Sequence, residues 1–167
     1  KVNWHPFNLG FVFRSNNYVL MEEPKAKMRN RKADLNRWAT FHNLPFKMPD
    51  NFPIKTSRAL RAAIASRQWN LEFEFMARMF SADWEQNTGT IGEYATLNAI
   101  AEKLGINPDK FEAACESAEV KQALIDSTNQ ALDRGVFGAP SIYLGDELYW
   151  GKDRMEFIDD QLASFNQ

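Results

Sequence analysis

The stretch that decides the fold runs from Gly135 to Arg154 and reads GVFGAPSIYLGDELYWGKDR. Two short runs rich in aromatic and branched residues, Ser141–Leu144 and Glu147–Trp150, flank the dipeptide Gly145-Asp146, which favours a two-residue hairpin turn. Helical spacing of apolar residues returns after the hairpin, at Met155, Ile158, Leu162 and Phe165. This stretch therefore predicts a β-hairpin followed by a helix.

The residues upstream of Gly135 read as a block of helices, because their apolar positions recur every three to four residues. Gly105 is predicted to stop one helix, Pro108 to lie in the first turn of the next, and Gly135 to end the last one. The predicted helices are Lys25 to about Leu44, Thr56 or Ser57 to about Met79 with a break near Trp69, one around Leu97–Leu104, a short one from Pro108, and one from about Ser117 to Arg134.

The N-terminal residues 1–13 are predicted to form a short strand that runs into a loop, since Val2 and Trp4 are followed by Pro6 and Gly10. One strand is not stable alone, so this strand and the hairpin are expected to share a small sheet that a helical block of roughly 100 residues interrupts. The sequence thus predicts an α/β fold. Its sheet domain comprises residues 1–20 and 135–167, and its inserted all-helical domain comprises residues 21–134.

Composition limits the possible functions. The chain has 167 residues, a formal net charge of −2 and no uninterrupted apolar run longer than four residues. A membrane span needs roughly 18 apolar residues, so no transmembrane helix is expected, and no global positive charge attracts nucleic acid or an anionic membrane. The single cysteine, Cys115, excludes an intrachain disulfide and fits a reducing, cytoplasmic location. The two histidines lack the spacing of metal ligands, so no metal is expected.

The decisive stretch resembles the thioredoxin-like superfamily, and within it the 2-hydroxychromene-2-carboxylate isomerases and the related kappa-class glutathione transferases. The resemblance implies a thioredoxin-like sheet with an inserted helical domain, and identifies Ala139-Pro140 as the family's cis-proline. A cis X-Pro bond exposes the preceding backbone to pairing with an extended peptide. In glutathione-using members this pairing holds the cysteinyl unit of glutathione; the alternative is a trans proline in an ordinary loop.

The resemblance also implies the cofactor-binding residues. Lys152 and Asp153 match positions that contact glutathione, and Arg154 belongs to the same signature. Backbone amides at a helix start attract a carboxylate and Asp153 attracts an ammonium, which together suit the γ-glutamyl end of glutathione. The alternative is an acidic residue that only stabilises its helix. Asn17 falls where relatives place a glutathione-contacting asparagine, although asparagine in a loop is often a turn former and Asn16 competes for the alignment.

The resemblance covers nearly the whole chain but not the family's opening strand and helix. The family's second strand and the loop after it match Trp4–Gly10. In relatives the missing helix begins with the serine that contacts the glutathione sulfur, so the catalytic serine is expected upstream of Lys1 and no catalytic residue is assigned. The upstream strand is expected to lie between the strand near Val2 and the hairpin, and residues 1–167 alone are expected to be an incomplete fold.

These matches predict a glutathione-dependent cis–trans isomerase that acts on 2-hydroxychromene-2-carboxylate or a similar aromatic pyruvate, as part of aromatic catabolism. Its expected partners are glutathione, a small aromatic substrate and a second copy of the chain. The alternatives are a kappa-like glutathione transferase or peroxidase, a disulfide oxidoreductase, and a non-enzymatic module that presents the proline edge to a peptide. Serine or Cys-x-x-Cys upstream of the chain would discriminate among them.

Other features have simpler interpretations. Cys115 lies among alanines with no histidine nearby, which favours an inert thiol. Trp38, Trp69 and the phenylalanines are expected in the core. A solvated face is favoured over a phosphate-binding one for the basic residues of the first long helix, which are Lys25, Lys27, Arg29, Arg31, Lys32 and Arg37.

Overall fold

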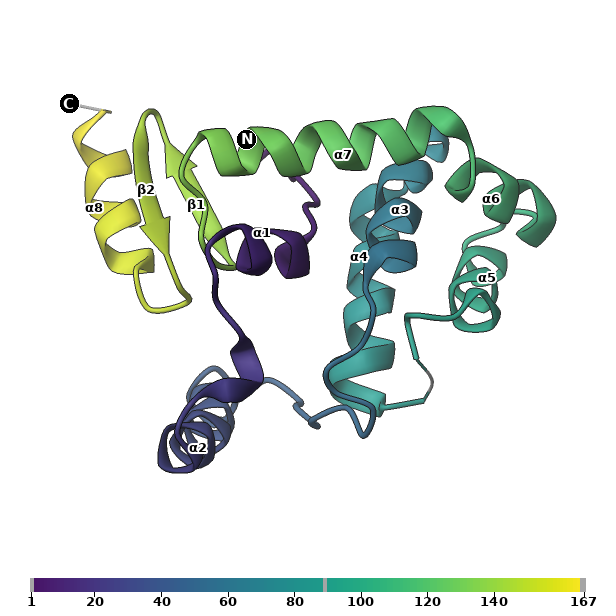
Figure 1. Ribbon diagram of the computed structural model, residues 1–167. Coiled ribbons are helices and arrows are strands. Elements are labelled where there is room, and N and C mark those ends of the chain that lie inside the picture. Colours follow the sequence, from purple (N-terminus) through teal and green to yellow (C-terminus); the bar gives the residue numbers. More distant parts are fainter. Residues whose placement is uncertain (1, 89, 166–167) are drawn as a thin grey trace.

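The computed structural model describes residues 2–88 and 90–165; residues 1, 89 and 166–167, which belong to the predicted sheet and helical domains, lie outside this description (Figure 1). Helices dominate, and within the described residues β1 and β2 are the only strands. The elements are α1 (Leu9–Ser15), η1 (Leu20–Glu22), α2 (Lys25–Phe41), α3 (Ser57–Ala65), η2 (Ser66–Trp69), α4 (Glu72–Phe80), the π-helical η3 (Ser81–Gln86), α5 (Tyr94–Lys103), α6 (Pro108–Cys115), α7 (Ala118–Asp133), β1 (Ser141–Leu144), β2 (Glu147–Trp150) and α8 (Met155–Ser164).

The hairpin and the helix after it form as the sequence predicts. Strands β1 and β2 are antiparallel with Ser141 opposite Trp150, and Gly145 in the turn has a φ of +64° that favours glycine. Tyr149 donates a hydrogen bond of 2.6 Å from its hydroxyl to Oε1 of Gln161 in α8. Residues alternate between the two faces of a strand, so Tyr149 faces α8 while Trp150 lies on the opposite face.

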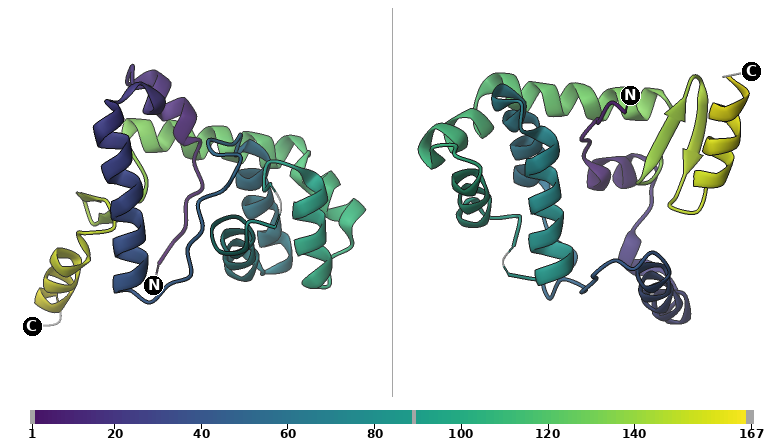
Figure 2. Two further views of the ribbon diagram at one scale, coloured as in Figure 1. Left: turned by 90° about the horizontal axis from the view of Figure 1, so that it is seen from below. Right: turned by 180° about the vertical axis from the view of Figure 1, so that it is seen from behind.

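Helix α7 connects the helical block to the hairpin (Figures 1 and 2). Ser117 caps its start by accepting a hydrogen bond from the Val120 amide, and Gly135 follows its end with a φ of +81°. Both signals are in the predicted places. One half of α7 packs on α3, and the other half lies beside α1 and leads into β1. The predicted helix breaks near Trp69 and at Gly105 are also confirmed.

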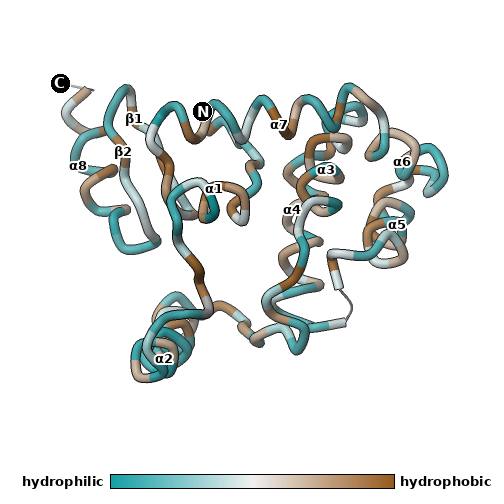
Figure 3. Tube along the Cα trace, viewed as in Figure 1, coloured by the Kyte–Doolittle hydropathy of each residue, from teal (hydrophilic) through white to brown (hydrophobic). Residues whose placement is uncertain are grey.

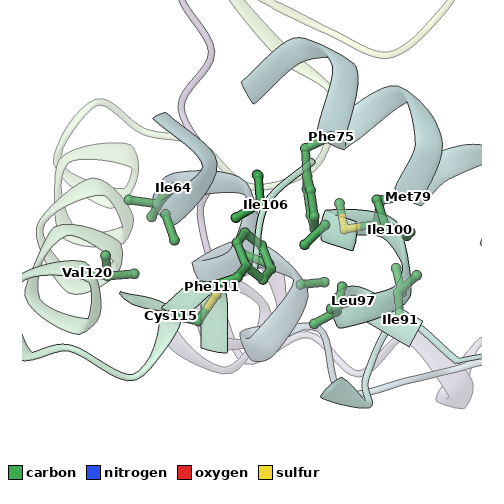
Figure 4. Close-up of a cluster of buried hydrophobic side chains, with 14 of the residues drawn as sticks. Ile64, Phe75, Met79, Ile91, Leu97, Ile100, Ile106, Phe111, Cys115 and Val120 are labelled. Atoms are coloured by element: carbon green, nitrogen blue, oxygen red, sulfur yellow. The ribbon is translucent and has the colours of Figure 1, made fainter. Parts of the chain in front are cut away.

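The hydrophobic core lies between α3, α4, α5, α6 and the first half of α7 (Figure 4). Phe75 and Phe111 are completely buried, with their ring centroids 4.9 Å apart, and Trp69 packs against Phe111 as expected for a core tryptophan. Truncating a buried phenylalanine to alanine typically costs about 3–5 kcal/mol. These contacts hold the helices of the block together.

The predicted N-terminal strand is wrong. Residues 2–8 are irregular and pair with no strand among the described residues, and Leu9 starts a helix where a loop was expected. The reason is local: the Asn8 side chain caps α1 by accepting a hydrogen bond of 3.0 Å from the Phe11 amide. In addition, Val12 is completely buried where α1 meets α7, and the Asn8 amide donates to Oγ1 of Thr128 in α7.

Helix α2 has no buried residue, and Figure 3 shows it largely in the colours of hydrophilic side chains. Its start is held by Glu23, whose carboxylate accepts a hydrogen bond of 2.7 Å from Tyr18 and contacts Lys27 and Arg31. The expected core position of Trp38 is wrong: this side chain is half-buried on α2 and lies outside the core cluster. The reason is that α2 stands apart from the helical block and meets the loop after β2 instead.

Candidate functional site

The Ala139-Pro140 peptide bond is cis, which confirms the prediction made for this proline. A second cis bond, Phe52-Pro53, was not anticipated. Ala139 is exposed, and within the described residues neither its backbone amide nor its carbonyl makes a hydrogen bond. Free backbone groups at an exposed edge are what an added extended peptide pairs with.

The loop that follows β2 is tied to this proline. The Gly151 amide donates a hydrogen bond of 3.1 Å to the carbonyl oxygen of Pro140. Trp150 packs so closely over Gly138 that a Cβ there would lie 2.2 Å from its indole Nε1 atom. Its ring also packs against that of Phe137, with the ring centroids 5.1 Å apart and the planes tilted by 54°. These contacts place the loop Lys152–Arg154 beside the free backbone edge of Ala139.

The loop Lys152–Arg154 leads into α8, as predicted. Arg154 is the residue that precedes the first turn of α8, and no side chain caps that turn. The first amides of a helix point outward and lack partners inside it, so an uncapped start attracts a carboxylate. Asp153 is exposed, and a hydrogen bond from its own backbone amide lowers its pKa, helped by Arg154 at 2.8 Å. A charged carboxylate thus stands beside an uncapped helix start.

Lys152 does not project freely into solvent. Its Nζ atom lies 3.3 Å from Oδ2 of Asp34 and 4.8 Å from the ring centroid of Trp38, and both of these residues belong to α2. Asp34 is not among the site residues predicted from the sequence. Asp34 is the sole acidic residue in Lys25–Phe41 and lies one helical turn from Trp38, but neither fact indicates a partner in the loop after β2.

Asn17 lies elsewhere. It follows α1 with a left-handed φ of +53°, and its amide donates to the carbonyl oxygen of Arg14. Asparagine tolerates this conformation well, so its position has a sufficient local explanation. Among the residues that the structure describes, no hydrogen bond or ion pair joins Asn17 to Ala139 or to Lys152–Arg154. Its role in binding glutathione stays a prediction.

No catalytic group can be assigned among the described serines and cysteine. Ser57 begins α3 but follows irregular backbone, and its hydroxyl oxygen accepts a hydrogen bond of 3.4 Å from Asn8. Cys115 is completely buried, and this burial raises the pKa of its thiol to about 12. Over residues 2–88 and 90–165, no group of three or more potential metal ligands gathers, and no helix is long and apolar enough to cross a membrane.

Several known proteins are similar to this chain in sequence or in fold. The 2-hydroxychromene-2-carboxylate isomerase of Pseudomonas putida is 29% identical over 150 residues, which cover 83% of this chain and 67% of that enzyme. Glutathione S-transferase kappa 2 of Caenorhabditis elegans is 28% identical over 173 residues, covering 94% of this chain and 76% of the transferase. A solved structure of 2-hydroxychromene-2-carboxylate isomerase superposes with a TM-score of 0.85 at 26% identity, over 99% of this chain and 81% of that one.

The chain spans about two thirds of the length of the curated isomerases that it matches, 63% to 68%. The superposition shows the thioredoxin-like fold with a helical insert that the sequence predicts. The family model of the DSBA-like thioredoxin domain matches residues 1–163, and the chain therefore belongs to that family.

Proposed function

We propose that this protein is a glutathione-dependent cis–trans isomerase of 2-hydroxychromene-2-carboxylate or a similar aromatic pyruvate. The observation that carries the proposal is the hydrogen bond between Gly151 and Pro140, because it brings a free backbone edge and a charged loop together. The isomerase relatives support the reaction class. We further propose that the protein works in the cytoplasm as a homodimer.

The residues present fit glutathione. The tripeptide is an extended peptide whose γ-glutamyl end carries a carboxylate and an ammonium on one carbon. The unpaired amide and carbonyl of Ala139 would hold the cysteinyl unit by strand-like pairing next to Pro140. Lys152, Arg154 and the uncapped start of α8 would receive the carboxylate, and Asp153 would receive the ammonium. Asn17 remains a proposed further contact.

When bound, glutathione supplies a thiol that adds reversibly to a conjugated double bond and so permits rotation about it. The chain's own share is placement. Ala139 fixes the middle of the tripeptide, while Lys152 and Asp153 fix its charged end. Holding the reactant by both parts limits its motion and orients it, which is a major source of rate enhancement in enzymes. We propose no thiol-activating group among the described residues.

A kappa-like glutathione transferase is the second candidate, because two transferases of this class match the chain. It would use the same glutathione site with a different electrophile. A disulfide oxidoreductase is less well supported by the described residues, since the thiol of Cys115 is buried and protonated.

The test is calorimetry of glutathione binding to the full-length protein, followed by an isomerase assay with the hydroxychromene carboxylate. We expect binding in the wild type and weaker binding in Asp153→Asn. We also expect isomerisation that requires catalytic amounts of glutathione and does not consume it. Consumption of glutathione by an electrophile without isomerisation would favour the transferase. An absence of glutathione binding would reject both.

A further inference from the structure

The ion pair between Lys152 and Asp34 joins two segments that are 118 residues apart in the sequence. It links α2 to the loop before α8, and both side chains are 42% exposed. A second cation faces the same carboxylate, because Nη1 of Arg37 lies 4.0 Å from Oδ1 of Asp34. The Asp34 carboxylate therefore stands between two cations, one from each element.

The surroundings of the pair leave room for a ligand. The centroid of the Trp38 ring lies 4.8 Å from the Lys152 ammonium, and the ring stacks on that of His42 with the centroids 5.5 Å apart. Trp38 therefore borders the ion pair on one side. A surface hollow of about 300 Å³ opens at the same place and is lined by Asp34, Arg37, Trp38 and Phe41. Its lining combines two aromatic rings with charges of both signs.

We propose that Asp34 is a specificity-determining residue for the ammonium of the γ-glutamyl end of glutathione, an inference that rests on the proposed function. The internal pair exchanges partners: the ligand carboxylate takes the place of Asp34 on Lys152, and the ligand ammonium binds the released Asp34 together with Asp153. The ligand thereby pairs with Lys152, Asp34 and Asp153 in place of the one ion pair between Lys152 and Asp34. A ligand that carries only the carboxylate would leave Asp34 with Arg37, 4.0 Å away, as its remaining cationic partner.

The electrostatics favour this exchange. Exposed ion pairs contribute little, so opening the pair between Lys152 and Asp34 loses little. The other charged groups at the place are Arg37, Asp153 and Arg154, and Asp153 is paired with Arg154 at 2.8 Å. Together with Lys152 and Asp34, these groups carry three positive and two negative charges, a net charge of +1. This balance suits glutathione, whose γ-glutamyl end is a zwitterion and whose overall charge is negative, and it disfavours a cationic ligand. Helix α2 contributes no buried residue, so the exchange of partners breaks no core packing of this helix.

The test compares glutathione with glutaryl-cysteinyl-glycine, which lacks only the α-amino group, by calorimetry on the full-length protein. The variants are Asp34→Asn and, as a control, Asp126→Asn. The control makes the same charge change at an exposed site on α7, where the Asp126 carboxylate accepts a hydrogen bond from Gln122. We expect the wild type and Asp126→Asn to bind glutathione more tightly than glutaryl-cysteinyl-glycine, by the same ratio of affinities. In Asp34→Asn we expect this ratio of affinities to fall about fivefold. In Asp34→Glu we expect part of the ratio to be restored.

Three outcomes would overturn the inference. If Asp34→Asn keeps the full preference for glutathione, Asp34 does not contact the ammonium and only this inference fails. If Asp34→Asn weakens both ligands equally, Asp34 has a merely structural role. If the wild type binds neither ligand, the proposed function fails as well. A thermal melt of each variant shows whether the fold is intact and separates the second outcome from unfolding.

Discussion

A Cβ atom added to Gly151 would lie 2.8 Å from the Oδ1 atom of Asp153. Gly151 also has a φ of +105°, which side-chain-bearing residues rarely adopt. Gly151→Ala should therefore both strain the backbone and push the Asp153 carboxylate out of place. We expect a loss of about 1–3 kcal/mol in the free energy of unfolding, measured by urea denaturation, and weaker glutathione binding in calorimetry.

Gly105→Ala is the matched control for this substitution. Gly105 has a φ of +78°, and a Cβ there would meet nothing within 4 Å. It should lose comparable stability while binding glutathione as the wild type does. Equal affinity in Gly151→Ala would show that the position of Asp153 does not matter for binding.

Local sequence signals predicted most of the fold. Gly145 at the hairpin turn, Ser117 at the start of α7 and Gly135 after its end each act on their immediate neighbours, so their effects can be read without tertiary structure. The N-terminal error has a local origin too. The Asn8 cap is a helix signal, but Val2, Trp4 and the aromatic residues near them suggest a strand that ends in a loop.

The candidate site was predictable only in part. The cis Ala139-Pro140 bond and the loop Lys152–Arg154 came from resemblance to a known family, and the structure places them side by side. The pair between Lys152 and Asp34 was not predictable, because no pattern in the sequence brings residues 118 positions apart into contact. Trp38 was misassigned for the same reason: its spacing fits a core residue, while its actual partner is Lys152.

Gly138 should be intolerant of a side chain because of Trp150. Its φ is not positive, so the expected cost comes from the contact alone: a Cβ would lie 2.2 Å from Nε1 of the indole. Gly138→Ala should lower the free energy of unfolding by about 1–3 kcal/mol, as overpacking typically does. Urea denaturation measures this loss.

A double-mutant cycle isolates the contact. In a Trp150→Ala background, Gly138→Ala should cost within about 0.5 kcal/mol of zero, because the clashing ring is gone. If Gly138→Ala costs the same in both backgrounds, the packing of Trp150 is not what requires glycine there.

Asp83 should make the protein less stable as pH rises. Its side chain is 2% exposed in the π-helical segment η3, and its Oδ2 atom has no hydrogen-bond partner among the described residues. Burial raises its pKa above the usual 3.8, so the folded state prefers the neutral acid. The stabilisation from this preference is complete below pH 3.8 and is lost as pH rises from there through the raised pKa of the folded state.

Asp83→Asn removes this pH dependence. At pH 8 the variant should be more stable than the wild type by about 1 kcal/mol or more, because an unpaired buried charge is avoided. The gain should shrink toward pH 4, and urea denaturation at both pH values measures it. The exposed Asp126→Asn provides the control for a change in net charge. A variant that is less stable than the wild type at pH 8 would show that the Asp83 carboxylate has a favourable partner.

Cys115 should be unreactive in the folded protein. With its pKa raised to about 12 by burial, only about one thiol in ten thousand is ionised at pH 8, and the side chain is also completely buried. Mass spectrometry should show that iodoacetamide at pH 8 leaves the native chain unmodified and alkylates it rapidly in urea.

Cys115→Ser should lower the free energy of unfolding by about 1–3 kcal/mol, because the hydroxyl replaces an apolar group in the core. Its glutathione affinity should not change. Stoichiometric alkylation of the native chain, or a loss of glutathione binding in a folded Cys115→Ser variant, would give this thiol a place in the chemistry and revive the disulfide oxidoreductase alternative.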